Sequence, residues 1–167
     1  MNITNLIPDH LLLPKDIPEM WKGSPFMGMW NLHSRTKGKR FELIVEEVLR
    51  ATGSKVQPKS GPGHDMRING SKVEVKGSML RTNTEDFSFL QIRPEQDHDQ
   101  YCFLCIRPDM ASIWFISKER IEQLIEEKNS LIMKQHLGKA GTSGTYCMYC
   151  DEEGLESIGA CRFDYTL

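Results

Sequence analysis

The sequence predicts a single α/β (α+β) domain in which helices pack on a β-sheet. Three observations lead to this fold class. A strong amphipathic helical pattern is followed by several short strand patterns, a hairpin-turn dipeptide joins two of those strands, and a second helical pattern comes after them. The length of 167 residues suits one domain rather than two.

Residues 1–30 carry four prolines and no sustained hydrophobic period, which predicts an irregular N-terminal arm that packs on the rest of the domain. The strongest helical pattern follows Gly38, in the segment KRFELIVEEVLRAT. Its apolar residues recur every three or four positions, so one face of this helix is expected to be buried. Gly53 ends the pattern.

Strand patterns follow the helix. The segment 55–58 predicts an edge strand, because its proline excludes it from the centre of a sheet. Asn69-Gly70 predicts a two-residue hairpin turn between alternating segments. Further strands are expected at 87–93, 100–107 and 111–116, the second of them central because its apolar run is continuous.

Ser117 has the residue type of a helix N-cap, and the apolar residues after it predict a helix over 117–137 that ends before Gly138. The C-terminal tail, 138–167, has short apolar pieces separated by glycines, which predict short strands or loops.

The net charge of −2, from 21 basic and 23 acidic residues, argues at first against a nucleic-acid-binding protein. The charge is unevenly distributed, however. Residues 15–81 hold 13 basic and 7 acidic side chains, whereas 82–167 hold 8 basic and 15 acidic ones. Such asymmetry indicates a surface that faces a polyanion. No signal peptide or membrane-spanning run is visible, so we expect a cytoplasmic protein with no membrane partner.

The predicted hairpin places Asp65 opposite Glu74, with Cβ atoms about 4.5–5.5 Å apart. Two carboxylates at this distance repel each other unless a cation or a proton neutralises them. Strand alternation puts Lys76 on the same face as Glu74, while the other face is apolar. Such a face suits Mg²⁺, with Lys76 activating the attacking water. An ordinary exposed ion pair is the alternative.

A third carboxylate comes from the first helix. Glu42 lies at the border of the buried face, whereas Glu47 points into solvent. We therefore expect Glu42 to reach the metal directly or through a bound water.

Glu42 on a helix, Asp65 at the start of a strand and the triplet Glu74-Val75-Lys76 together resemble the PD-(D/E)XK nuclease superfamily, most of all its type II restriction endonucleases. The resemblance covers residues 38–116, the expected catalytic core. It implies a restriction-endonuclease-like fold with a mixed central β-sheet flanked by helices. It also implies one or two Mg²⁺ ions, with the Val75 carbonyl as a further ligand.

The function implied by the resemblance is Mg²⁺-dependent hydrolysis of phosphodiester bonds in double-stranded DNA, as in restriction–modification. The small size implies either a homodimer or the catalytic subunit beside a larger recognition subunit. Two alternatives stay open. One is a non-catalytic or zinc-containing DNA-binding module of the same fold, and the other is a structure-specific nuclease that acts on junctions or in repair.

Candidate DNA contacts come from two segments, because phosphate contacts dominate nucleic-acid affinity. In the second segment, strand alternation puts Gln91 and Arg93 on the strand face opposite to Leu90 and Ile92. Gln91 would reach the site if this strand neighbours Glu74. A solvated basic loop and a polar strand face are the respective alternatives. The candidates are Arg35, Lys37, Lys39 and Arg40 in the first segment and Gln91 and Arg93 in the second.

Two C-x-x-C pairs, Cys102 with Cys105 and Cys147 with Cys150, have the spacing of a four-thiolate zinc site. Residues three apart on a strand point to opposite faces, however. Buried thiols are therefore favoured over a zinc site.

Overall fold

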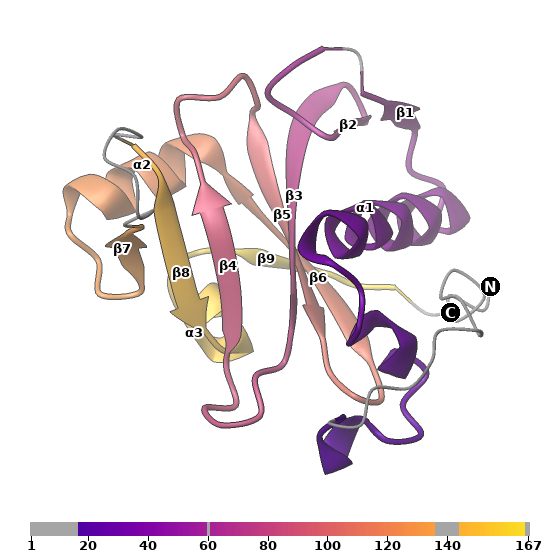
Figure 1. Cartoon of the computed structure of the whole chain (residues 1–167). Coiled ribbons are helices and arrows are strands. Elements are labelled where there is room, and N and C mark those ends of the chain that lie inside the picture. Colours follow the sequence, from indigo (N-terminus) through magenta and orange to yellow (C-terminus); the bar gives the residue numbers. More distant parts are fainter. Residues whose placement is uncertain (1–16, 60, 136–143, 166–167) are drawn as a thin grey trace.

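The computed structural model describes residues 17–59, 61–135 and 144–165. In these ranges the chain folds as one α+β domain with a six-stranded mixed sheet, a three-stranded antiparallel sheet and three α-helices (Figure 1). The predicted fold class is therefore confirmed at this level. No helix in these ranges is long and apolar enough to cross a membrane.

The N-terminal arm lies against the domain by burying large side chains. Residues 17–30 contain only two short 3₁₀ helices, η2 (Glu19–Trp21) and η3 (Met27–Met29). Trp21, Phe26 and Met29 are almost fully buried in the main hydrophobic core. The arm is thus irregular and packed, as predicted, over the part that is described; residues 1–16 lie outside it.

Helix α1 (Ser34–Ala51) begins five residues before the apolar pattern that predicted it. His33 caps the helix, because its Nδ1 accepts the backbone N–H of Arg35 at 3.4 Å. The basic stretch is consequently helical, and the alternative of a solvated loop is wrong. The sequence hid this start because no apolar residue precedes Phe41 in the helix.

The six-stranded sheet has the order β1-β2-β3-β5-β6-β9. Only the β3–β5 pair is parallel, so the sheet is mixed. Strand β5 is buried along almost its whole length and β1 lies at an edge, as predicted. The strands are β1 (Val56–Pro58), β2 (Met66–Ile68), β3 (Ser71–Met79), β5 (Gln100–Ile106), β6 (Ala111–Ser117) and β9 (Cys161–Phe163).

The hairpin between β2 and β3 has the predicted turn and register. Ile68 pairs with Ser71, and Met66 pairs with Val73. Both turn residues, Asn69-Gly70, have positive φ, at 51° and 96°, as a two-residue hairpin of this composition requires.

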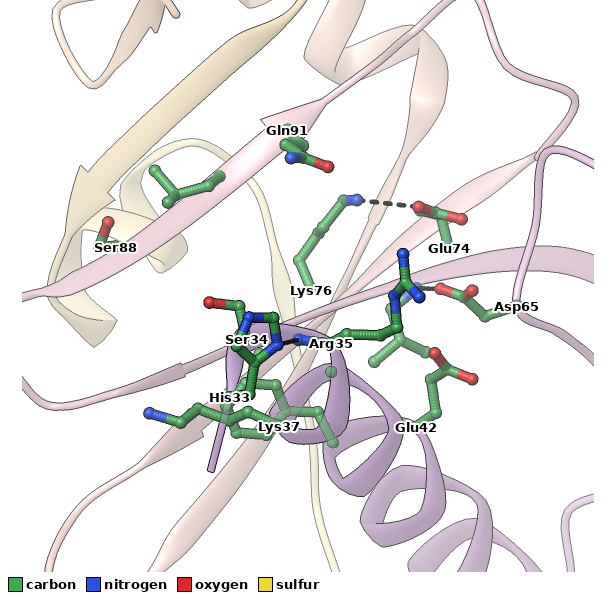
Figure 2. A pocket seen from close by; sticks show the side chains of 15 residues that line it. His33, Ser34, Arg35, Lys37, Glu42, Asp65, Glu74, Lys76, Ser88 and Gln91 are labelled. Carbon is green, nitrogen blue, oxygen red and sulfur yellow. Dashed lines mark hydrogen bonds and ion pairs between the residues drawn. The ribbon is translucent and has the colours of Figure 1, made fainter. Parts of the chain in front are cut away.

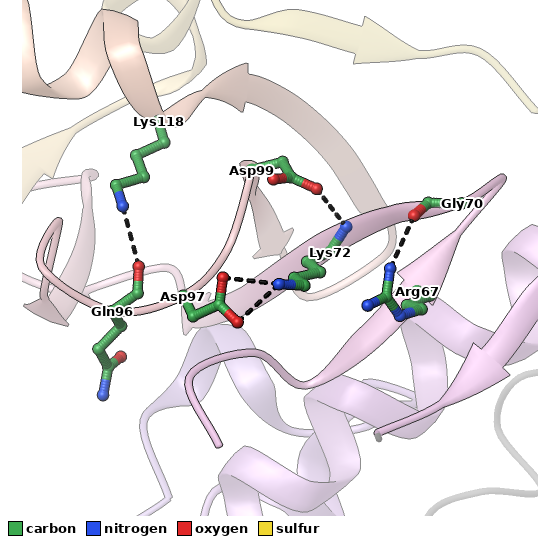
Figure 3. A network of polar contacts seen from close by, with 7 residues as sticks. All are labelled: Arg67, Gly70, Lys72, Gln96, Asp97, Asp99 and Lys118. Carbon is green, nitrogen blue, oxygen red and sulfur yellow. Dashed lines mark hydrogen bonds and ion pairs between the residues drawn. The ribbon is translucent and has the colours of Figure 1, made fainter. Parts of the chain in front are cut away.

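A polar network ties the start of β3 to the loop before β5 (Figure 3). Lys72 donates its backbone N–H to Asp99 at 2.8 Å and binds both carboxylate oxygens of Asp97 through its ammonium group, at 2.7 and 2.6 Å. Lys118 donates to the carbonyl of Gln96 at 2.9 Å. The hydrogen bond from Lys72 lowers the pKa of Asp97. These contacts fix the end of β3 that carries the candidate site.

The second sheet has the order β4-β8-β7, from β4 (Phe87–Ile92), β8 (Tyr146–Cys150) and β7 (Ile132–Lys134). Strand β4 follows β3 in the chain, but β3 forms its hydrogen bonds with β5. The condition under which Gln91 was expected to reach the site, that β4 lies beside Glu74 in the same sheet, is therefore not met. The predicted parity is wrong, because a bulge with Gln91 at φ 57° leaves Leu90 exposed and Ile92 buried.

Helix α2 (Lys118–Glu126) has the predicted cap, since the side chain of Ser117 accepts the N–H of Arg120 at 3.1 Å. The predicted extent of 117–137 is wrong, because the helix ends at Glu126 and Lys128 adopts a φ of 55°. Ile132, which fitted the apolar pattern, belongs to β7 instead.

The tail after residue 143 contains the strands β8 and β9, as its pattern predicted. It also contains a short helix that was not predicted, α3 (Glu152–Ser157), which Asp151 caps through the N–H of Gly154 at 2.8 Å. Residues 138–143 lie outside the described ranges.

Burial of His98 gives the fold a pH-dependent stability. Desolvation, followed by the charge of Lys118, lowers the pKa of His98 to about 4. The unfolded chain therefore binds a proton on His98 at higher pH than the folded chain does. We expect the free energy of unfolding to fall as the pH drops from about 6.5 toward 4.

Replacing His98 with phenylalanine tests this expectation, because phenylalanine keeps the edge-on ring contact with Tyr101 but cannot be protonated. Urea unfolding of the wild type and His98→Phe at several pH values should show a shallower acid slope in the variant. If the free energy of unfolding depends on pH equally in the two proteins, the acid sensitivity comes from groups other than His98.

Helix α1 packs closely on β3 at Gly77. A Cβ atom at this position would lie 2.2 Å from the ring of Phe41. The missing side chain thus lets α1 approach the strand that carries Glu74 and Lys76, which places Glu42 at the same cavity.

Candidate functional site

A cavity of about 660 Å³ lies between the start of α1, the strand β3 and the strand β4. Figure 2 shows its side chains converging from these three elements. Its lining includes the predicted catalytic residues Glu42, Asp65, Glu74 and Lys76, together with Val75, which was predicted as a metal ligand. The structure therefore brings together, from separate elements, the residues that the sequence had grouped by pattern.

Asp65 is held by the backbone of β3. The β2–β3 pairing begins at Met66, one residue after Asp65, so Asp65 and Glu74 are not a paired position of the two strands. Its N–H donates to the carbonyl of Val73 at 3.0 Å, and its carboxylate accepts the N–H of Val75 at 2.9 Å. The two acids still lie side by side, because these bonds hold Asp65 against the strand that carries Glu74.

Glu74 and Lys76 form an ion pair that is largely removed from water. The Lys76 Nζ lies 2.8 Å from the Glu74 Oε1, and the two side chains are only 15% and 13% exposed. This burial distinguishes them from an ordinary surface ion pair on a hairpin.

The pKa of Glu74 is raised, first by burial and then by the charge of Asp65, while Lys76 acts in the opposite direction. Burial is the largest of these causes, because it makes the charged form of the carboxylate less favourable. A divalent cation would relieve the excess negative charge, and carboxylate oxygens are the ligands that Mg²⁺ prefers.

Two of the cavity carboxylates form ion pairs with lysines. Glu74 is paired with Lys76, and Glu42 accepts a hydrogen bond from Lys39 at 2.6 Å. In the described ranges, no group of three or more His, Cys, Asp or Glu side chains is arranged to hold a metal ion. To bind a metal ion, the carboxylate of Glu42 would have to give up its ion pair with Lys39.

The predicted DNA contacts divide into three groups. Arg35 and Lys37 line the cavity, as does Gln91, even though β4 belongs to the second sheet. Lys39 reaches the cavity only through its ion pair with Glu42, which raises the pKa of the lysine. Outside the lining are Arg40 and Arg93, the latter within 3.3 Å of the Gln91 side chain.

Several lining residues were not predicted. Ser34 was missed because the helix begins earlier than its apolar pattern. Phe41 was predicted only as a core residue, and Leu90 enters the lining because of the bulge in β4. No local sequence signal indicates these contacts, which depend on packing between elements.

The cysteines lie away from this cavity. Cys102 and Cys105 are buried in β5, and burial raises the pKa of both thiols. Burial likewise raises the pKa of Cys150 to about 12. All five cysteines are free thiols, and only Cys161 is exposed.

Thiol titration tests this arrangement and the zinc alternative together. With an aromatic disulfide reagent, we expect one thiol to react rapidly in the native protein, because Cys161 alone is exposed. All five should react in guanidinium without a chelator. Rapid reaction of further thiols in the native protein, or a need for chelator after unfolding, would contradict the prediction.

A scan against protein-family models gives no match, and a search of curated proteins gives none either. The fold and the site define the chain as a single-domain α+β protein with a largely buried carboxylate–lysine cluster in the same cavity as the cationic start of α1.

Proposed function

We propose that the protein is a Mg²⁺-dependent endodeoxyribonuclease of the PD-(D/E)XK type, most similar to type II restriction endonucleases. One observation carries the proposal: Asp65, Glu74 and Lys76 meet Glu42 in one cavity, next to the cationic start of α1. Acids suited to a hard cation thus lie beside groups suited to phosphate.

The fold supports the finer assignment. Its central sheet is mixed, with β3 parallel to β5, and α1 packs on the strand that carries the acidic-X-Lys triplet. A mixed central sheet with a helix packed on it is what the resemblance implies for a restriction-endonuclease-like domain.

Asp65 and Glu74 would hold the Mg²⁺, with the Val75 carbonyl as the further ligand implied by the resemblance and Glu42 nearby. When bound, Mg²⁺ supplies charge neutralisation at the phosphate and makes water a better nucleophile. The hydrogen bond from the Val75 N–H holds Asp65 in place before any ligand arrives.

Lys76 would act on the attacking water. Its ammonium group would orient a water molecule and offset negative charge on the phosphate oxygens. The water oxygen would attack phosphorus and give up one proton to solvent, the bond to the leaving oxygen would break, and the leaving oxygen would take up a proton from solvent.

Arg35 and Lys37 would position the phosphate backbone of double-stranded DNA. Both side chains line the cavity at the first turns of α1 (Figure 2). Base recognition would come from a second copy of the chain or from a larger partner subunit, as the resemblance implies.

Incubation of the purified chain with supercoiled plasmid tests the proposal. Cleavage should require Mg²⁺ and stop in EDTA, and sequencing of the ends should locate the cuts. Specific double-strand cuts support a homodimer, whereas single-strand nicks support a catalytic subunit. Absence of cleavage in Mg²⁺, or equal cleavage in EDTA, would contradict the proposal.

A further inference from the structure

A second cavity of about 440 Å³ adjoins the candidate site. The two cavities share Lys37, Phe41, Gly77 and Ser88 as lining residues. From this shared wall, the second cavity continues along the end of β3 and the residues that follow, as far as Arg81. A strand that lies over the carboxylates can therefore continue into it.

The second cavity is lined by cations without acidic side chains. In the described ranges its charged residues are Lys37 and Arg81, and no Asp or Glu belongs to the lining. The ammonium group of Lys37 donates one long hydrogen bond, of 3.4 Å, to the carbonyl of Trp30. Burial lowers the pKa of Lys37. A phosphate group would supply the missing negative charge.

The Arg81 side chain, at the far end of this cavity, makes two contacts and is still partly exposed. Its guanidinium lies 3.4 Å from Asp86 and 5.2 Å from the ring centroid of Tyr149, and the side chain remains 42% exposed. These two contacts orient the guanidinium and leave room for a further acceptor.

The remaining wall is apolar. Trp30 packs against the buried Trp21, with ring centroids 5.7 Å apart, and lines the cavity together with Phe41, Met79 and Leu80. Cations beside an aromatic and aliphatic wall match the chemistry of a nucleotide, whose phosphate is charged and whose sugar and base have apolar faces.

We propose that the second cavity binds the nucleotide next to the cleaved phosphodiester in the same DNA strand. Its phosphate lies between Lys37 and Arg81, and its sugar lies against Trp30. The identity of the ligand as DNA rests on the proposed function, but binding in this cavity requires no catalysis.

Two measurements in EDTA test the subsite with a 12-base-pair duplex as the probe. Duplex binding should change the tryptophan fluorescence of the wild type, and Trp30→Phe should lose most of that change, because Trp21 and Trp114 are buried. Arg81→Gln should weaken binding, measured by fluorescence anisotropy, and should lower the salt dependence by about one phosphate contact.

Arg50→Gln is the matched control. Arg50 is similarly exposed, at 47%, and similarly ion-paired, with Glu46, but it lies in the last turn of α1. This variant should keep the salt dependence of the wild type.

Equal effects of Arg81→Gln and Arg50→Gln would overturn the subsite. The same holds if inorganic phosphate at equal phosphate concentration reproduces the fluorescence change. Loss of binding in Arg81→Gln without any cleavage by the wild type would support the subsite and contradict the nuclease. Cleavage by the wild type, together with unchanged binding in Arg81→Gln, would contradict the subsite and support the nuclease.

Discussion

Replacement of Lys76 with alanine is expected to slow Mg²⁺-dependent DNA cleavage by about 10²- to 10⁴-fold, the usual contribution of a positioned acid–base group. Lys76 lies inside the cavity, 2.8 Å from Glu74, and is largely buried. Loss of its ammonium group removes the cation that would orient the attacking water and offset the charge on the phosphate. The effect should appear in single-turnover cleavage rates.

Lys22→Ala is the control for this prediction. Lys22 is an exposed lysine whose ion-pair partner, Glu19, is exposed as well, so its removal should leave cleavage unchanged. Circular dichroism and duplex binding in EDTA should show that both variants are folded and bind DNA. If Lys76→Ala cleaves as fast as Lys22→Ala, Lys76 is not a catalytic residue.

Gly77→Ala is expected to destabilise the fold by about 1–3 kcal/mol, the usual cost of overpacking a core. The added Cβ would lie 2.2 Å from two ring carbons of Phe41 and 2.8 Å from its Cβ. Relief of this clash requires α1 to move away from β3. Because Glu42 follows Phe41 directly, the same movement should displace Glu42 and lower the rate of cleavage.

Two further variants make the test specific. Gly38 also lies in α1, but a Cβ there meets no atom within 4 Å, so Gly38→Ala should stabilise the helix by about 0.5–1 kcal/mol. Adding Phe41→Ala to Gly77→Ala removes the two ring carbons and leaves only the contact with the Cβ of residue 41, so the pair should be less destabilising than the sum of the single changes. Urea unfolding should be measured for the wild type, the three single variants and the double variant, and a wild-type midpoint in Gly77→Ala would contradict the prediction.

Local patterns predicted the features that local chemistry determines. Asn69-Gly70 determined the β2–β3 register, and the proline in 55–58 placed β1 at an edge. The same hairpin placed Asp65 beside the Glu74–Lys76 strand, so the centre of the site could be predicted from twelve residues, 65–76, of one supersecondary unit.

Features that depend on contacts between distant elements could not be predicted. The departure of β4 into a second sheet depends on its pairing with β8, more than fifty residues away in the chain. The turn at Lys128 ended a helix whose apolar period continued by coincidence to Ile132. Trp30 and Arg81, which form the second cavity, meet only because the arm and the end of β3 pack together.

The central claim is that the cavity carboxylates support metal-dependent cleavage of DNA. The most direct test compares plasmid cleavage by the wild type and by Glu74→Gln at the same Mg²⁺ concentration, since glutamine keeps the size of the side chain and removes its charge. The wild type should cleave in Mg²⁺ and stop in EDTA, and the variant should be slower by at least about 10²-fold. Equal rates in the two proteins would contradict the claim.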